Sequence, residues 1–459
     1  MIRCHERLIS VKDDQKNFLL FAVLAGLILF GWPYLSGWLF PTANPPVTQI
    51  EGGRTKVVAN TAADPAADSP AAVRDRAAVL RESPRVRIAT PRLAGSINLR
   101  GARIDDLVLT RYKETIAANS PPIRLLSPSG TADAYFAGFG WSGNGVTAPA
   151  ADTLWQASGT VLAPGRPVTL SATQGTQRYR IDLSVDDGYM FTVRQSVANA
   201  GAAPIQVATY GLLNRRGVSK DSDTWTMHVG PVASHDGGVD FDTNYDDVDE
   251  APLQHATQGG WVGFTDTYWL TALIPDQRAS NALQFRKAGG DGYQADAKPA
   301  ELRQLAPGAQ VSQTTRFFAG AKEVDVLDGY ADAGIAGLGN AIDWGWFGIV
   351  EKPIFQVLHW LFRMVGNFGV AIILLTLAIR LLMFPIAQRQ FASAASMRAL
   401  QPKMKALQQR FKDDKVRLQQ ETMKLYKDEK VNPLAGCLPT LVQIPVFYAL
   451  YKVLLLTIE

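Results

Sequence analysis

Residues 368–387 read FGVAIILLTLAIRLLMFPIA, an apolar run of membrane-spanning length that contains a single charged residue, Arg380. About 20 apolar residues, each rising 1.5 Å along a helix, cross the hydrocarbon core of a bilayer. We therefore predict a transmembrane helix over 367–387. Two further runs predict transmembrane helices of the same kind, FLLFAVLAGLILFGWPYLSGWLF at 18–40 and LAGCLPTLVQIPVFYALYKVLLL at 434–456. A cleaved signal peptide is the alternative for 18–40, although its apolar part would be only about 7–15 residues long.

The composition sets wider limits on the class of protein. The chain has 459 residues, of which 47% are hydrophobic and 19% are charged, with Gly 39 and Pro 26. These values exclude a collagen, a wholly disordered chain and a disulfide scaffold. The net charge of +4 is also too small for a dedicated nucleic-acid binder. At roughly 150 residues per domain, the length allows about three structural units.

Charge is distributed unevenly on either side of the apolar runs. Segment 388–433 has 11 basic residues against 5 acidic ones, and residues 1–17 have 4 against 3. Because basic loops stay on the cytoplasmic side, we expect 1–17 and 388–433 in the cytoplasm and the long segment between 41 and about 366 outside it. The two cysteines, Cys4 and Cys437, lie on the cytoplasmic side or at its membrane edge, so the exported segment has no disulfide available.

The exported segment has two parts. Residues 41–84 are rich in Ala, Pro, Asp and Ser without apolar periodicity, which indicates a flexible linker. Residues 85–330 contain short alternating runs such as RYRIDLSV at 178 and YMFTVRQSV at 189, separated by Gly, Pro, Asn and Asp. Alternation with a period of two predicts a large all-β antiparallel sandwich.

A catalytic or metal site in this sandwich is not predicted. His228, His235 and His255 and an acidic stretch at 236–250 are present, but no HExxH, GxSxG or paired-cysteine spacing occurs. We therefore expect no metal site, no cofactor and no enzyme activity. Trp261 and Trp269 are assigned by alternation to one strand face, where core packing is a commoner role than sugar binding.

Segment 343–366, DWGWFGIVEKPIFQVLHWLFRMVG, predicts an amphipathic helix. Its apolar residues recur at helical spacing, while Glu351, Lys352 and Arg363 lie largely on the opposite side. Directly before a transmembrane run, such a helix is expected to lie in the headgroup plane, with Asp343 as its N-cap. An ordinary helix packed on the sandwich is the alternative.

Arg380 is the most unusual residue of the chain. An arginine at the centre of a membrane helix costs about 2.5–3.5 kcal/mol on insertion scales and usually faces a bundle interior or a watery cavity. Thr376 lies one turn earlier on the same face, and Gln443 near the middle of the third run could join the same polar patch. Snorkelling is the alternative for Arg380, and it is the expectation for Lys452 near the outer end of its run.

Segment 388–433 predicts a helical hairpin with an apolar seam and a basic exterior. Positive-inside retention is the simplest role, and anionic lipid, ribosomal RNA and acidic proteins are possible partners. The basic residues at the centre of the hairpin are Lys403, Lys405, Arg410, Lys412, Lys415 and Arg417.

With these features in place, the chain resembles the YidC family of bacterial membrane protein insertases, in the Gram-negative form with a large periplasmic domain. The resemblance is most specific in GGWVGFTDTYWLTALIPD at 259, RFFAGAKEVDVLDGY at 316, GNFGVAIILLTLAIRLLMFPIAQRQ at 366 and the stretch from MRALQPKMKAL at 397 to VQIPVFYALY at 442. It implies a mutarotase-like β-super-sandwich in the periplasm, an inner-membrane location with several spans, and a hydrophilic groove that contains Arg380, Thr376 and Gln443.

The resemblance also implies a mechanism without covalent chemistry or nucleotide. The groove would receive the polar part of a nascent membrane protein, and the hydrophobic helix of that substrate would slide out along the third run. Leu441, Ile444, Pro445 and Phe447 would form this slide. Implied partners are nascent membrane proteins, the Sec translocon, the ribosome and anionic lipid. Family members continue with further transmembrane helices, so a chain truncated after the third helix is expected.

Two other functions remain open from the sequence. One is a membrane-anchored periplasmic carbohydrate-binding protein, and the other is a scaffold for the translocon. An insertase and chaperone should need Arg380, whereas both alternatives should tolerate its loss.

Overall fold

The computed structural model describes residues 49–51, 54–56, 73–117, 119–221, 226–412, 414–429 and 438–458. The chain divides into two compact units, 1–61 and 62–459. In the first unit the described residues form one small antiparallel hairpin, β1 (Gln49–Glu51) with β2 (Arg54–Lys56). The predicted helix at 18–40 lies outside the described residues.

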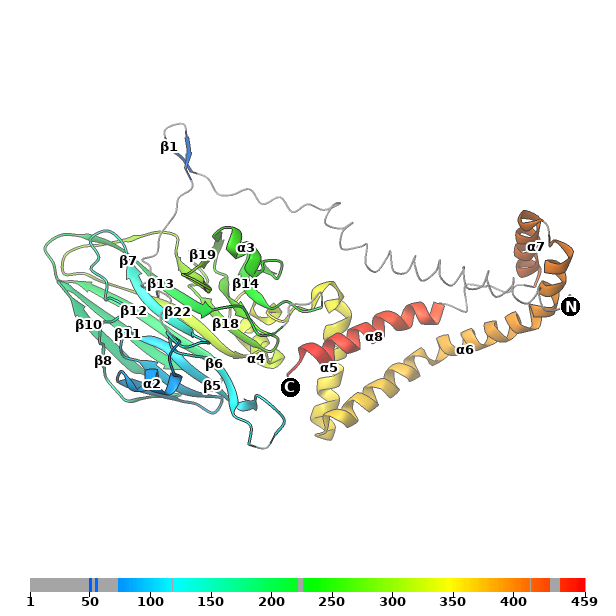
Figure 1. Ribbon diagram of the computed structural model, residues 1–459, viewed down its shortest axis with the longest axis horizontal. Helices are drawn as coiled ribbons and strands as arrows, with labels where there is room; N and C mark the ends of the chain where they lie inside the picture. Colours follow the sequence, from blue (N-terminus) through cyan, green and yellow to red (C-terminus); the bar gives the residue numbers. More distant parts are fainter. Residues whose placement is uncertain are drawn as a thin grey trace. The chain divides into compact units, whose positions relative to one another are not determined.

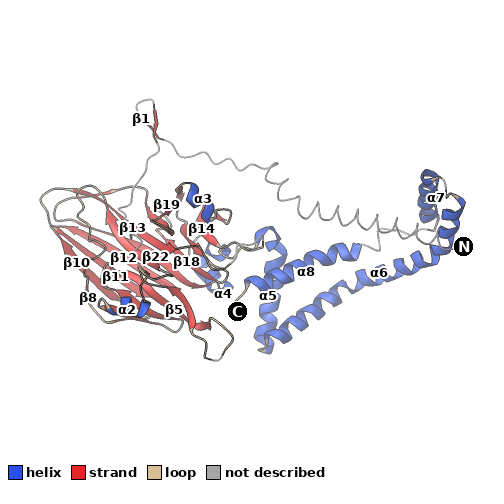
Figure 2. Cartoon of the chain, viewed as in Figure 1, coloured by secondary structure: helices blue, strands red, loops and turns tan. Residues whose placement is uncertain are grey.

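The second unit begins with a large β-sandwich made of two sheets. In the nine-stranded sheet the strand order is β15-β14-β17-β18-β22-β12-β11-β10-β8. The other, eleven-stranded sheet has the order β16-β19-β20-β13-β7-β5-β4-β3-β9, with β21 beside β13 and β6 beside β5. Figure 2 shows these strands gathered in one part of the unit, followed by the helices. The strand bounds are β3 (Arg85–Ala89), β4 (Leu93–Asn98), β5 (Arg103–Lys113), β6 (Pro122–Leu126), β7 (Tyr135–Ser142), β8 (Gln156–Ala157), β9 (Val161–Leu162), β10 (Val168–Gln174), β11 (Gln177–Val185), β12 (Met190–Asn199), β13 (Ile205–Arg216), β14 (Gly230–His235), β15 (Gly238–Asp240), β16 (Leu253–Gln258), β17 (Trp261–Thr265), β18 (Trp269–Ile274), β19 (Ser280–Lys287), β20 (Gly292–Pro299), β21 (Arg303–Leu305) and β22 (Gln310–Ala321).

Alternating side chains of the two sheets form the core. In β11 the buried residues alternate with more exposed ones along nearly the whole strand, as a half-buried strand requires. The largest fully buried side chains include Trp141, Trp261, Tyr179, Phe264 and Phe317. The fold is therefore the predicted all-β sandwich, held by apolar burial.

The assignment of Trp261 and Trp269 to one strand was wrong. They lie on successive strands of a hairpin, β17 and β18, because the chain turns at Asp266. Trp261 is fully buried, whereas Trp269 is only partly buried and packs edge-on against Tyr112. Gly263 of this hairpin permits close strand approach, since a Cβ there would lie 1.8 Å from the carbonyl oxygen of Thr271.

Short helices flank the sandwich. Helix α2 (Arg76–Arg81) falls at the end of the expected linker. It is joined to the domain by its buried Val79 and by a hydrogen bond from Arg74 N to the Gly130 carbonyl at 3.0 Å. In the sequence, helix α3 (Tyr245–Glu250) falls between β15 and β16, and helix α4 (Val324–Asp332) follows the last strand, β22. The 3₁₀ turns η1 (Leu338–Asn340) and η2 (Gly345–Phe347) then lead to the longer helices.

Among the described residues, four longer helices follow the sandwich, and they are labelled in Figure 1. They are α5 (Gly348–Val365), α6 (Phe368–Arg410), α7 (Lys415–Asp428) and α8 (Leu438–Leu456). Helix α5 starts after η2 with Phe347 at its N-cap, so Asp343 is not the cap as expected. Among the described residues, one helical segment is long and apolar enough to cross a membrane, Phe368–Pro385, and a shorter apolar helix covers Gln443–Leu456.

Candidate functional site

The turn between α5 and α6 sets the start of the arginine-bearing helix. Gly366 ends α5 in the left-handed conformation with φ 66°, and its N–H donates to the Phe362 carbonyl at 2.8 Å. Asn367 then caps α6, because its side-chain oxygen accepts a hydrogen bond from Val370 N at 3.1 Å. The sequence Gly-Asn therefore reverses the chain in two residues and begins the predicted membrane span.

Arg380 lies on α6 with its side chain exposed. Thr376, one turn earlier, donates from Oγ1 to the Ile372 carbonyl at 2.8 Å, so its hydroxyl is satisfied within the helix. In the part of the chain that the structure describes, no hydrogen bond or ion pair of Arg380 with Thr376 or Gln443 is recorded. The three predicted groove residues are thus present on two helices, and among the described residues no recorded hydrogen bond or ion pair joins them.

Apolar side chains surround Arg380 on α6 and remain uncovered. Leu377 is 53% exposed, Leu381 66% and Leu382 74%. Exposed apolar surface of this extent on a helix marks a contact with lipid or with another protein. Arg380 is thus a charged residue within an apolar helix surface, a position that is costly for an arginine without water or a polar partner.

Helix α8 presents a second apolar face. Ile444, Phe447 and Tyr451 are 59%, 57% and 56% exposed and recur at helical spacing. Pro445 is half-buried, and the side chain of Leu441 lies outside the described residues. Two of the four predicted slide residues, Ile444 and Phe447, therefore share one open face.

Helix α8 packs against α5 with a buried charged contact between them that the sequence did not predict. Lys452 Nζ lies 3.9 Å from Glu351 Oε2, and both side chains are buried. Nearby, Phe347 packs on Tyr448 with ring centroids 5.1 Å apart. The expectations of a snorkelling Lys452 and of Glu351 on the polar side of its helix were therefore wrong, because the two helices pack these residues against each other.

The carboxyl of Glu351 has no hydrogen-bond donor, since neither of its buried oxygens has a partner. Burial raises the pKa of Glu351 to about 7, while Lys452 opposes the rise and Asp343 adds to it. The only sequence signal for this contact was Lys452 itself, a charge within an apolar run.

The basic hairpin is closed by contacts between the end of α6 and α7. Lys403 pairs with Glu429, and the Tyr426 hydroxyl lies 3.5 Å from Met404 Sδ. Around the bend, Arg410 and Arg417 stack over the Phe411 ring at 5.7 and 5.8 Å. Lys403, Lys405, Arg410, Lys412 and Arg417 are exposed. Most of the predicted basic residues thus face outward.

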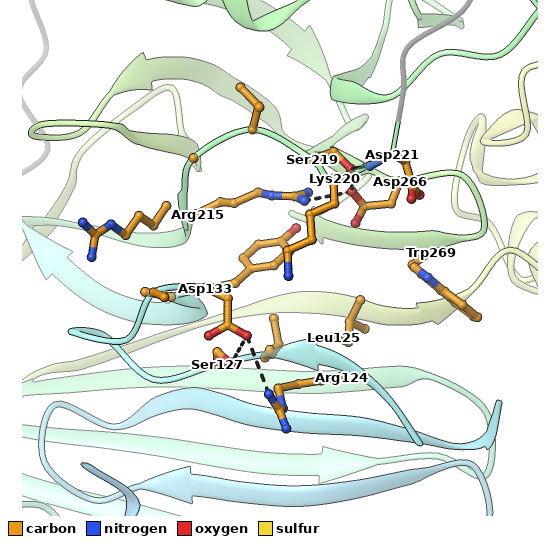
Figure 3. Close-up of a pocket in the computed structure, with 17 residues that line it drawn as sticks. Arg124, Leu125, Ser127, Asp133, Arg215, Ser219, Lys220, Asp221, Asp266 and Trp269 are labelled. Carbon is orange, nitrogen blue, oxygen red and sulfur yellow. Dashed lines mark hydrogen bonds and ion pairs between the residues drawn. The ribbon is translucent and has the colours of Figure 1, made fainter. Parts of the chain in front are cut away.

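The sandwich contains a polar cavity of about 350 Å³, drawn in Figure 3. Arg215 enters it from β13 and pairs with Asp266 at 2.9 Å. On the opposite wall Asp133 accepts from Ser127 at 3.2 Å and faces Arg124 at 3.7 Å. Because the charges on each wall pair with one another, a structural ion-pair network explains this cavity better than a catalytic centre does.

Comparison with known proteins places these elements in a family. A model described as the YidC periplasmic domain matches residues 85–357, and one described as a 60Kd inner membrane protein matches 360–459. Membrane protein insertase YidC of Zymomonas mobilis is 46% identical over 98% of this chain and 77% of its own length. That of Methylorubrum extorquens is 41% identical over 97% of this chain and 78% of its own length.

The chain belongs to the YidC family of membrane protein insertases. The predicted resemblance, the non-enzymatic class and the combination of a β periplasmic domain with inner-membrane helices are thereby confirmed. The two family models meet within α5, so this helix is the junction between the parts of the chain that match the periplasmic domain and the inner membrane protein.

Solved structures of similar fold include an active YidC insertase crystal structure with the first transmembrane domain resolved. It is 19% identical, covers 82% of this chain and 72% of that chain, and has a TM-score of 0.29. A galactose mutarotase-like protein from Lactobacillus casei is 11% identical and covers 51% of this chain and 99% of that chain, with a TM-score of 0.36.

Proposed function

We propose that this YidC-family chain receives nascent inner-membrane proteins in a hydrophilic groove around Arg380 and releases their apolar helices into lipid along α8. The observation that carries the proposal is the exposed Arg380 within an otherwise apolar, uncovered stretch of α6. A charge at this depth costs about 2.5–3.5 kcal/mol unless water or a polar partner solvates it. A polar segment of a substrate in transit supplies such a partner.

The electrostatic role of Arg380 is to shorten the apolar barrier. The substrate's exported segment contains polar groups that cannot enter hydrocarbon alone, and a hydrated cation inside the bilayer lowers the cost of their passage. Thr376 and Gln443 would extend the polar path on α6 and α8. Because the process needs no nucleotide, the absence of a GxxxxGK[ST] motif from the sequence is consistent with it.

Release is then driven by burial of the substrate helix in lipid. The open face of Ile444 and Phe447 on α8 offers an apolar surface along which that helix can move outward. Such a surface guides the substrate without holding it, since lipid is equally apolar. Lipid burial of about 20 apolar residues makes the step irreversible.

The charge pattern supports a multi-pass topology in the bacterial inner membrane. The N-terminus and the hairpin at 388–433 would be cytoplasmic, and spans at 18–40, 367–387 and 434–456 would connect them to the periplasmic domain. The exposed basic residues of the hairpin would meet anionic lipid or the ribosome at the cytoplasmic surface. The Sec translocon would be a further partner, as the family resemblance implies.

Replacement of Arg380 tests the proposal directly. The Arg380→Ala chain should insert a small single-span reporter into vesicles at least about tenfold more slowly than the wild type. A tenfold change in rate corresponds to about 1.4 kcal/mol, which is less than the free-energy cost of an unsolvated charge in the membrane. Arg380→Lys should retain more activity than Arg380→Glu.

A matched control removes a different cation. Arg363 is exposed on α5, outside the predicted span, so Arg363→Ala should insert the reporter at the wild-type rate. Normal insertion by Arg380→Ala at equal protein levels would disprove the groove mechanism and favour the scaffold alternative. The carbohydrate-binding alternative gains no support, since the charges of the sandwich cavity pair with one another.

A further inference from the structure

Three potential metal ligands meet at one edge of the sandwich. They are His235, Asp240 and His255, and one ligand atom of each lies within 4.8 Å of the others. The two imidazole rings stack with centroids 4.1 Å apart, and His235 Nε2 is 3.9 Å from Asp240 Oδ2. Ligands at about 2.0–2.1 Å from a tetrahedral Zn²⁺ are about 3.3 Å apart, so closure needs shifts of about 1 Å. Because the rings are stacked at 16° to each other, one imidazole must also rotate about its side-chain bonds to direct its nitrogen lone pair at the ion.

Both imidazoles have a nitrogen that makes no hydrogen bond. Nε2 of His235 and Nε2 of His255 are buried without any hydrogen bond. A buried polar atom left unsatisfied costs about 1–3 kcal/mol, and two on adjacent rings are unusual in a native protein. A cation between the rings and the carboxylate would satisfy all three groups together.

Neighbouring groups already orient the ligands. His235 Nδ1 lies 3.2 Å from Asp236 Oδ2, so an N–H donated there leaves the Nε2 lone pair for a metal. The Asp240 carboxylate accepts from Asp242 N at 2.8 Å and from the Thr243 hydroxyl at 2.8 Å. A carboxylate on the far nitrogen of a histidine and hydrogen bonds to an acidic ligand are the supports that zinc sites use.

The ligands come from both sheets. His235 ends β14 and Asp240 ends β15, at the edge of the nine-stranded sheet. His255 lies in β16, at the edge of the eleven-stranded sheet. An ion held here would join two open sheet edges in a domain whose sequence contains no cysteine.

We propose that His235, Asp240 and His255 bind one Zn²⁺ ion that fastens the two sheets of the periplasmic domain at this edge. Two imidazoles and one carboxylate form a ligand set that zinc accepts, with a fourth position left for solvent. The competing explanation is an ion pair between a protonated His235 and its two aspartates. That pair leaves His255 Nε2 without a partner, whereas the zinc site uses it.

The test is a zinc titration of the full chain in detergent after removal of metal with a chelator. Isothermal calorimetry should show one Zn²⁺ per chain, and mass spectrometry of metal content should recover one equivalent after desalting. Zinc at 100 times its dissociation constant should also raise the melting temperature of the periplasmic domain, because it binds only the folded state. Mg²⁺ should do neither, since it prefers oxygen ligands.

Variants separate the site from adventitious binding. His255→Gln should weaken zinc binding by at least about a hundredfold, and Asp236→Asn, which alters only an exposed supporting residue, by about tenfold. Two control variants change residues outside the ligand set: His359→Gln removes a histidine, and Asp242→Asn removes an exposed acid. Both should bind zinc with the wild-type affinity. Asp236→Asn keeps the test valid should His255→Gln not fold.

Two results would overturn the proposal. One is a wild-type chain that binds zinc no more tightly than magnesium. The other is equal zinc affinity in wild type, His255→Gln and Asp236→Asn. Neither result bears on the insertion assay, so the zinc site and the Arg380 groove are tested independently.

Discussion

Glu351 places a carboxyl group in the buried contact between α5 and α8, where its only charged neighbour of opposite sign is Lys452 at 3.9 Å among the described residues. Removing a carboxylate from water without hydrogen-bond donors favours its protonated form. The contact is therefore sensitive to pH in the neutral range, unlike an exposed pair between the same residue types.

This burial predicts how stability depends on pH. The folded pKa of Glu351 is raised from 4.5 to about 7, so the folded chain binds this proton more tightly than the unfolded chain does. Stability should accordingly fall as pH rises from about 4.5 to about 7 and change little through this group above that range. Glu351→Gln should remove this fall and raise the melting temperature at pH 8 by at least about 2 °C.

Thermal unfolding of the full chain in detergent between pH 4.5 and 8 measures this effect. Glu114→Gln is the control, since Glu114 is exposed on the sandwich, and its profile should follow that of the wild type. Parallel profiles for wild type and Glu351→Gln would contradict the assignment of a buried, proton-binding Glu351.

Among the elements, the turn between α5 and α6 determines how the membrane helix leaves the junction. Its conformation depends on Gly366, which adopts φ 66° at the end of α5. The left-handed conformation costs a residue with a Cβ roughly 1–2 kcal/mol. No atom lies within 4 Å of the position that a Cβ would take, so a steric clash is not the reason for glycine here. The turn therefore depends on the backbone conformation that glycine adopts readily.

Gly366→Ala should destabilise this turn by about 1 kcal/mol and increase cleavage by an added protease between α5 and α6. Gly329→Ala is the matched control. Gly329 lies inside α4 with equally open surroundings, so alanine should be neutral or stabilising there. Equal cleavage rates in both variants and the wild type would show that Gly366 is not required for the turn.

At the scale of the whole molecule, Glu323, at the N-cap of α4, connects the two sheets of the sandwich. Its carboxylate accepts from Tyr112 at 3.0 Å and from Tyr189 at 2.6 Å, and Arg92 lies 2.5 Å away. Tyr112 is on β5 of one sheet, while Tyr189 precedes β12 of the other. One side chain thus links both sheets at the start of α4.

Glu323→Ala should lower the free energy of unfolding of the periplasmic domain by about 3 kcal/mol, because it leaves the largely buried Arg92 guanidinium without its counter-ion. Chemical denaturation of the full chain, followed by tryptophan fluorescence, measures the change. Glu301→Ala, at an exposed position, should unfold at the wild-type midpoint. A Glu323→Ala midpoint equal to that of Glu301→Ala would refute the linking role.

The sequence by itself determined those features that depend on neighbours within one element. Alternation identified the all-β domain, an apolar run identified the helix at 368–385, and the long family resemblance identified the insertase class, and each of these was confirmed. The groove, slide and hairpin residues remain predictions, although Ile444 and Phe447 do share an open face.

Only the tertiary structure decided which residues meet across elements. It buried Glu351 against Lys452, separated Trp261 from Trp269 at a hairpin, and brought His235 and Asp240 of one sheet edge to His255 of the other. The physical reason is the distance along the sequence over which each feature is determined. Periodicity reflects how one element meets its surroundings, whereas a contact between elements follows from strand register and helix packing, which sum many weak interactions along the whole chain.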